Sequence, residues 1–269
     1  MLKLSRSWAA VVFLVLMVLG FVLGSAIAAA ETDRAEGTAW EAVDGIKIDG
    51  SLDEWNRSSP FFLNKKSQMI TGANFWKGAE NGSATVYFMW DKDNLYIGAV
   101  ILDNAPYMSR MGFSPEEADS IGIFMSTNPD ADLARKAYDS TDFSVLFILD
   151  GNEFNTAIMR DMVADPKGIE TIGEYSYEQI LDGYEAAMTE TEEGYVFEAK
   201  VPLSNFANEA LPLLVPTVGM IISFDVKLDD LDMPCPGVAA TSLTWTGSKN
   251  IRTDPSEWGL LHFETAKEN

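Results

Sequence analysis

Carboxylates are the side chains of this sequence that are best placed to do chemistry. Asp49 and Asp53 stand in one tight turn, and Asp103 and Asp119 flank one long loop. Outside the cell, Ca²⁺ is held by roughly six to eight oxygens, of which carboxylates supply the charged ones. We therefore expect these aspartates to bind structural calcium, with backbone carbonyls and water completing the shell.

Two further acidic stretches leave the choice between a metal site and a solvated surface open. Residues 91–94 place oxygens two positions apart but lack the rest of a calcium-binding loop, so a solvated hairpin tip is the better interpretation. Residues 229–232 are ambiguous in the same way.

Aromatic residues could bind a sugar, because the apolar C–H face of a pyranose fits an aromatic ring. Trp76 lies in irregular sequence and could form a stacking platform with Phe75 and Tyr107. A hydrophobic plug at the end of a sandwich explains Trp76 equally well. Trp245 is also a candidate, although its alternation with Leu243 favours a place in the core.

Polar residues that could hydrogen-bond sugar hydroxyls lie on the longest strand candidate, Val218 to Leu228, and on the sequence after it. Its even-numbered side chains from Ile222 onward are apolar and predict the core face, so the odd-numbered ones predict an open face. Solvated charges are the simpler explanation for that face. The polar candidates for sugar binding are Asp225, Lys227, Asn250 and Arg252.

Catalytic interpretations have little support, and we expect no enzymatic activity. With 41 acidic residues, carboxylate pairs spaced as in a glycosidase occur by chance. The single histidine, His262, argues against His-rich zinc sites and catalytic triads, and no glycine-rich phosphate loop is present. The single cysteine, Cys235, cannot form an internal disulfide.

The first thirty residues have the features of a signal peptide. Lys3 and Arg6 precede an apolar run, and small residues at positions 28–30 precede polar sequence. The run is short for the ~20 residues of a membrane span, so cleavage after Ala30 is favoured over a retained anchor. We expect a secreted or periplasmic protein with a flexible lead-in over residues 31–43 and one domain over residues 44–269.

The charge of the chain limits its partners. The formal net charge is −22, and removal of Lys3 and Arg6 with the signal peptide would make it −24. Such a surface repels nucleic acid and anionic lipid and attracts cations. We therefore expect that the chain does not bind nucleic acid or, after cleavage, a membrane. We also expect it to be a monomer.

The elements that must position these residues are almost all strands. Short runs of alternating polarity recur every 8–12 residues or so, which is typical of a sandwich or jelly roll. Helical signals are limited to a few turns, at residues 132–138, 176–181 and 202–206. The sequence predicts an all-β fold, an antiparallel jelly-roll-like β-sandwich with a few short helices.

The order of several motifs resembles carbohydrate-binding module family 9 and its DOMON-like relatives. The first is an Ile-Asp-Gly-x-Leu-Asp-Glu turn that ends at a tryptophan, and another is a Gly-Tyr-x-x-Glu-Ala-x-x-Pro strand. The resemblance covers about residues 44–264. The matching segments are residues 48–55, 90–96, 119–120, 194–202, 219–230 and 245–259.

This resemblance implies a jelly roll with structural calcium, no catalysis, and a sugar end held between two tryptophans. The two tryptophan positions carry Glu116-Glu117 and Ile251-Arg252 in this sequence, and two polar positions carry Gly122 and Ser144. The resemblance therefore carries over the fold but not the sugar clamp.

Three functions remain open from the sequence. The first is a secreted, non-catalytic carbohydrate-binding module that binds a glycan at its open face and end loops. The second is the haem b-binding electron-transfer domain of some DOMON-like relatives, with axial ligands drawn from Met108, Met111, Met125, Met159 and His262. The third is a structural or adhesion module without a small ligand.

Overall fold

The computed structural model describes residues 34–43, 45–106, 118–150, 153–161, 181–207, 212–232 and 241–266. The predicted signal peptide, residues 1–30, lies outside these ranges. Within them, no helix is both long enough and apolar enough to cross a membrane.

Strands dominate the described part of the chain, with three short 3₁₀ helices between them. The strands are β1 (Glu36–Glu41), β2 (Phe61–Leu63), β3 (Met69–Thr71), β4 (Ser83–Trp90), β5 (Asn94–Leu102), β6 (Ser120–Ser126), β7 (Asp142–Asp150), β8 (Glu153–Asp161), β9 (Glu185–Thr191), β10 (Gly194–Pro202), β11 (Ile221–Asp230), β12 (Thr241–Thr244) and β13 (Gly259–Glu264). The 3₁₀ helices are η1 (Lys66–Gln68), η5 (Leu203–Phe206) and η6 (Pro255–Glu257).

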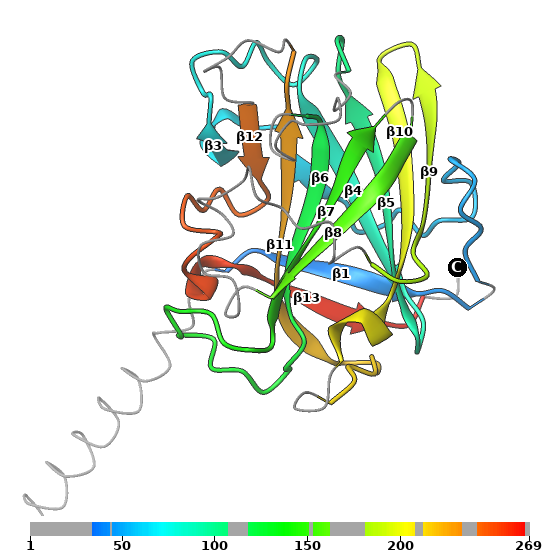
Figure 1. Cartoon of the computed structure of the whole chain (residues 1–269), viewed down its shortest axis with the longest axis vertical. Coiled ribbons are helices and arrows are strands. Elements are labelled where there is room, and N and C mark those ends of the chain that lie inside the picture. Colours follow the sequence, from blue (N-terminus) through cyan, green and yellow to red (C-terminus); the bar gives the residue numbers. More distant parts are fainter. Residues whose placement is uncertain are drawn as a thin grey trace, which may run out of the picture. The chain divides into compact units, whose positions relative to one another are not determined.

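The strands form two layers that are joined by hydrogen bonds. The main path runs β8-β7-β6-β11-β13-β1-β4-β5-β10-β9, and its two ends, β8 and β9, contact each other. Strands β6, β7, β8 and β11 therefore make one layer, and β4, β5, β9 and β10 make the other. The link between them is β13 with β1, which run across the other strands in Figure 1.

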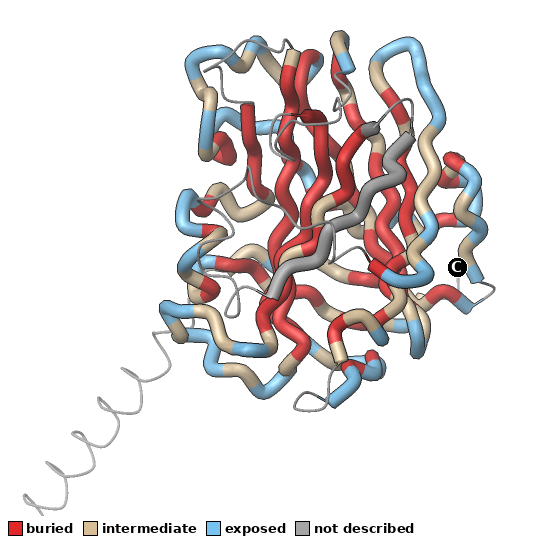
Figure 2. Tube along the Cα trace, viewed as in Figure 1, coloured by how far each residue is buried: buried red, intermediate tan, exposed pale blue. Residues whose placement is uncertain are grey.

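The core lies between the layers and is built by strict alternation. On β11 the inward side chains are Ile222, Phe224, Val226 and Leu228, all at most 1% exposed, as the sequence predicts. Phe88 of β4 meets Phe224 across the core with ring centroids 4.9 Å apart in an edge-to-face arrangement. Figure 2 shows the buried residues concentrated in the strands and the exposed ones in the connections. Each fully buried Phe or Leu contributes about 1.5–3 kcal/mol, so this alternation explains the two layers.

The predicted all-β sandwich is confirmed, with differences of detail. Residues 36–41, expected in the lead-in, form β1, which pairs in parallel with both β13 and β4, so the sheet is mixed rather than purely antiparallel. Residues 132–138, expected to be helical, form turns. Of the predicted turns of helix, residues 203–206 form η5, and most of residues 176–181 lie outside the described ranges.

The opening turn packs on the outer face of the second layer and is held there by one carboxylate. Glu198 of β10 accepts hydrogen bonds through Oε2 from the backbone N–H groups of Asp49, Gly50 and Ser51, at 2.6–3.1 Å. Gly50 has a φ of 84°, which favours glycine, and a Cβ there would lie 2.3 Å from the hydroxyl of Thr189. The Asp-Gly turn is therefore an anion-binding loop for Glu198.

Candidate functional site

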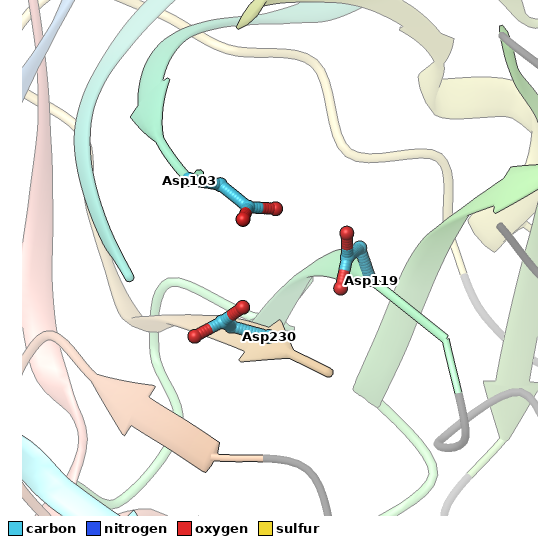
Figure 3. Close-up of side chains that lie close together, drawn as sticks. All are labelled: Asp103, Asp119 and Asp230. Atoms are coloured by element: carbon cyan, nitrogen blue, oxygen red, sulfur yellow. The ribbon is translucent and has the colours of Figure 1, made fainter. Parts of the chain in front are cut away.

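Three aspartates converge at one end of the core, and each continues an inward-facing row of a strand. On β5, Ile101 faces the core and Asp103 is the next inward position. The same step leads from Ile121 to Asp119 before β6, and from Leu228 to Asp230 at the end of β11. One oxygen of each carboxylate lies within 4.8 Å of those of the other two, and all three residues are buried. Figure 3 shows the carboxylates turned toward one shared space.

The cluster has more negative charge and more free oxygens than its own contacts satisfy. Oδ1 of Asp103 accepts from the Ala105 N–H at 2.8 Å, and Oδ1 of Asp119 accepts from the Leu231 N–H at 2.8 Å. Asp103 Oδ2 and Asp230 Oδ1 are buried without a hydrogen-bond partner. Buried groups of this kind are costly unless something binds them.

Burial also shifts the acidity of the cluster. It raises the pKa of Asp103, and burial together with the nearby charge of Asp103 raises the pKa of Asp230 to about 7. Both shifts show that the ionised form is unfavourable here without a cation. Three convergent, buried carboxylates, of which Asp103 and Asp230 each have an unpartnered oxygen, are the kind of ligand set that a hard divalent cation such as Ca²⁺ requires, so the residues fit the expected ion.

The surroundings of the cluster keep it compact. Gly82 lies so close to Asp230 that a Cβ at residue 82 would be 2.3 Å from Asp230 Oδ2. The Gly82 carbonyl accepts a 2.7 Å hydrogen bond from Trp76 Nε1. The nearby cation Lys77 pairs with Asp232 at 2.8 Å. The loop before β4 therefore covers the cluster, and the charge of Lys77 is directed to Asp232.

The structure brings together only two of the four aspartates predicted to bind calcium. Asp103 and Asp119 meet, whereas Asp49 and Asp53 belong to no such cluster in the described ranges. Asp49 instead forms a 2.5 Å ion pair with Lys47, and Asp53 is exposed. The turn binds the Glu198 carboxylate through its backbone N–H groups and does not use its own carboxylates for that contact. Asp230 was left ambiguous by the sequence, although the alternation from Val226 through Leu228 points to it.

The aromatic candidates for sugar stacking lie largely against the core. Trp76 and Trp245 are partly buried and pack on the core cluster, and the ring of Trp245 is centred 4.6 Å from that of Phe61. Phe75 is 66% exposed, so it is the ring of this set that faces solvent. Tyr107 lies outside the described residues. The plug interpretation therefore fits Trp76 better than the stacking platform.

Most of the β11 positions predicted to form an open face are closed, although Ile221 at the start of the strand is exposed. Asp225 is fully buried, with Oδ1 accepting from the Val226 N–H at 2.8 Å, and burial raises its pKa to about 7. Lys227 is 3% exposed and pairs with Asp229 at 2.7 Å. Ser120 and Ser242 also donate to Asp229, at 3.0 and 2.5 Å. These side chains form a buried polar network, and their predicted place on a solvated surface is wrong.

The last two polar candidates lie on the loop before η6. Asn250 is exposed and donates to Glu257 at 2.9 Å, and Arg252 is half-buried. The loop is held by Trp258 Nε1, which donates to the Ile251 carbonyl at 2.8 Å. The Ile251 side chain packs with Phe124 and Trp258. The residues predicted to bind sugar that the structure describes therefore lie in three different environments: the core, the buried polar network and this exposed loop.

The residues proposed as haem ligands do not favour that alternative. Met125 is fully buried in the core, and His262 Nε2 lies 3.4 Å from Glu36 Oε2 on the neighbouring strand. The side chain of Met159 and the residues Met108, Met111 and Cys235 lie outside what the structure describes.

Comparison with known sequences gives one consistent result. A family model described as "Carbohydrate family 9 binding domain-like" matches residues 48–266. Endo-1,4-beta-xylanase A of Thermoanaerobacterium saccharolyticum is 25% identical over 217 residues, and Exoglucanase XynX of Acetivibrio thermocellus is 26% identical over 216 residues. Each alignment covers 80% of this chain but only 15% or 16% of the relative.

Solved structures agree on the fold. A carbohydrate binding module family 9 from Caldicellulosiruptor kristjanssonii in complex with cellotriose has a TM-score of 0.59 and 18% identity, covering 87% of this chain and 96% of that one. A putative carbohydrate-binding protein from Bacteroides uniformis has a TM-score of 0.54 and 12% identity, covering 86% of this chain and 100% of that one. At these identities the likeness shows the fold alone.

Proposed function

The chain belongs to the carbohydrate family 9 binding domain-like family, and from this premise we propose that it is a secreted, non-catalytic carbohydrate-binding module whose loops are stabilised by calcium. The observation that carries the proposal is the family match, which spans the sandwich from the opening turn to β13. Relatives of the same fold are described in complex with cellotriose and with glucose, so β-glucans are the first ligands to test.

Calcium would be held by Asp103, Asp119 and Asp230. The first comes from the β4–β5 layer and the other two from the β6–β11 layer, so an ion among them would tie the layers together. Its charge would offset carboxylates that burial makes unfavourable when ionised. The two unpartnered oxygens of Asp103 and Asp230 support this assignment.

A binding role without catalysis is supported by where the carboxylates lie. The three convergent aspartates are buried at one end of the core. Asp225 and Asp229 are also buried, in hydrogen-bonded positions. The segment matched in the xylanase and exoglucanase relatives is a small part of each protein. Export is supported by the charged, apolar and small-residue order of residues 1–30.

Calorimetric titration tests the proposal. The chain without residues 1–30 is titrated with glucose, cellotriose and xylotriose, in calcium and in chelator. We expect saturable binding of at least one of these sugars in calcium and weaker binding in chelator. The absence of binding at millimolar sugar would overturn the proposal, and a Soret band in the purified protein would replace it with the haem alternative. Mass spectrometry of the exported protein tests cleavage after Ala30.

A further inference from the structure

A pocket of about 410 Å³ lies beside the aspartate cluster. Its walls come from the turn after β5, the end of β7 and the hairpin of β9 and β10. Small-molecule sites have volumes of roughly 300–1,000 Å³, so the pocket is large enough for one or two sugar rings. It shares Asp103 with the cluster but is otherwise made of residues not yet given a role.

The pocket has an apolar floor and an acidic rim. Leu149 and Tyr195 are buried at its base, with the half-buried Met188 beside them. Glu190 pairs in register with Tyr195, whose side chain is in the core, so Glu190 lies on the core-facing side of β9. An apolar surface with a few convergent polar groups is the common form of a ligand site.

Asp103 connects this pocket to the cluster. It is 3% exposed, lines the pocket, and its Oδ2 has no hydrogen-bond partner. A cation in the cluster would satisfy this acceptor and would also fix the carboxylate that borders the pocket.

The charge of the lining selects among ligands. Asp103, Glu190 and Glu192 line the pocket, and none of its described lining residues is Lys, Arg or His. A divalent ion among three aspartates would still leave the cluster with a net negative charge. The pocket should therefore accept hydroxyl donors and repel carboxylate-bearing sugars such as uronates.

We propose that this pocket receives the end of a neutral sugar chain, with Glu190 and Asn104 at its rim accepting hydroxyl hydrogen bonds and Leu149, Met188 and Tyr195 contacting the ring. The proposal rests on the carbohydrate-binding function above and names the place and the charge class of the ligand. Because Asp103 belongs to both the pocket and the calcium cluster, calcium and sugar should each increase the affinity for the other.

The test compares Glu190→Gln with Glu193→Gln. Glu193 lies three positions away in the same hairpin, is exposed, and does not line the pocket, so its substitution makes the same charge change outside the site. Cellotriose is titrated into each protein in saturating calcium. We expect E190Q to weaken binding about tenfold, the loss of one charge-assisted hydrogen bond, and E193Q to leave it unchanged. Both residues are exposed, and thermal unfolding verifies that both variants fold.

A second comparison uses glucose and glucuronate, which differ in one carboxylate. The wild-type protein should bind glucuronate at least tenfold more weakly than glucose, and E190Q should narrow that difference. Two results would overturn the proposal that this pocket binds the sugar while leaving the carbohydrate-binding function in place. One is equal affinity of the wild-type protein for glucose and glucuronate, and the other is an E190Q affinity for cellotriose equal to that of wild type. Failure of the wild-type protein to bind any neutral sugar would overturn both.

Discussion

The indole nitrogen of Trp55 donates a 2.6 Å hydrogen bond to Oε1 of Glu198, a residue 143 positions further along the chain. The other carboxylate oxygen accepts from three successive backbone N–H groups of the opening turn. Burial raises the pKa of Glu198, so these donors compensate for a desolvated charge. One side chain of β10 therefore fixes the whole opening segment on the outer face of the sandwich.

Substitution of Glu198 should destabilise the fold strongly. In Glu198→Gln, an amide group replaces one acceptor oxygen among four donors, which leaves buried N–H groups unsatisfied. We expect a loss of about 3 kcal/mol in the free energy of unfolding, measured by urea denaturation. The variant Trp55→Phe removes one donor and part of a buried ring but leaves the three backbone hydrogen bonds in place, so it should lose less, about 2 kcal/mol. Equal losses of stability in the two variants would contradict the conclusion that Glu198 holds the opening turn through several hydrogen bonds.

Calcium should reverse the effect of removing Asp230. In chelator, Asp230→Asn removes a buried carboxylate that Asp103 repels, so the variant should be at least as stable as wild type. At free calcium 100 times its Kd, wild type should gain about 2.7 kcal/mol and the variant far less. Asp53→Asn, in the exposed turn, is the control and should gain as much as wild type. A calcium gain that survives in D230N would disprove the assigned ligand.

The burial of Asp225 predicts a pH dependence. Its pKa is raised from 3.8 to about 7, so between those values the folded protein holds a proton that the unfolded chain has released. Stability falls with rising pH wherever the folded state binds more protons, so this residue's contribution should decline from about pH 4 to 7 and be constant above. Relative to wild type, Asp225→Asn should gain stability across that window, by at most about 4 kcal/mol.

Urea denaturation at several pH values in saturating calcium measures this difference, because the aspartate cluster then contributes equally to both proteins. Asp93→Asn, at the exposed tip of the β4–β5 hairpin, is the control and should follow the wild-type curve. A wild-type and a D225N curve that run parallel from pH 4 to 8 would rule out the proton at Asp225.

The packing of Trp245 separates a core role from a sugar-binding role. Its ring contacts Phe61, and a Cβ on Gly259 would lie 2.3 Å from the ring, so the indole is closely enclosed. Trp245→Ala should lower the free energy of unfolding by about 3 kcal/mol. Sugar affinity per folded molecule, measured by calorimetry below the melting temperature, should stay within twofold of wild type. A large loss of affinity with unchanged stability would return Trp245 to the binding site.

Local alternation was sufficient to predict the long strands, because burying every second side chain leaves a signal of period two. It could not predict β1, whose partners Leu260 and Phe88 lie far away in the sequence. Nor could it predict β2 and β3, which have only three residues each. Pairing with distant strands, and not local preference, determines these elements.

For the site, composition indicated oxygen ligands but not their positions. Asp49 and Asp53 have the right side chains, yet their turn contributes backbone N–H groups to Glu198. Asp225 and Lys227 have the polarity of a surface, but neighbouring acceptors and donors allow them to be buried. Whether a polar residue is solvated depends on what covers its strand, and a single sequence does not contain that information.

The parallel pairing of β1 with β13 sets an order on assembly. Residues 36–40 align with residues 260–264, so the first strand finds one of its two neighbours only when the last strand has been synthesised. Contacts of such long sequence separation form late and slowly. A nascent chain that ends before Gly259 therefore lacks the bridge between its two layers, and the sandwich cannot close until residues 259–264 have left the ribosome.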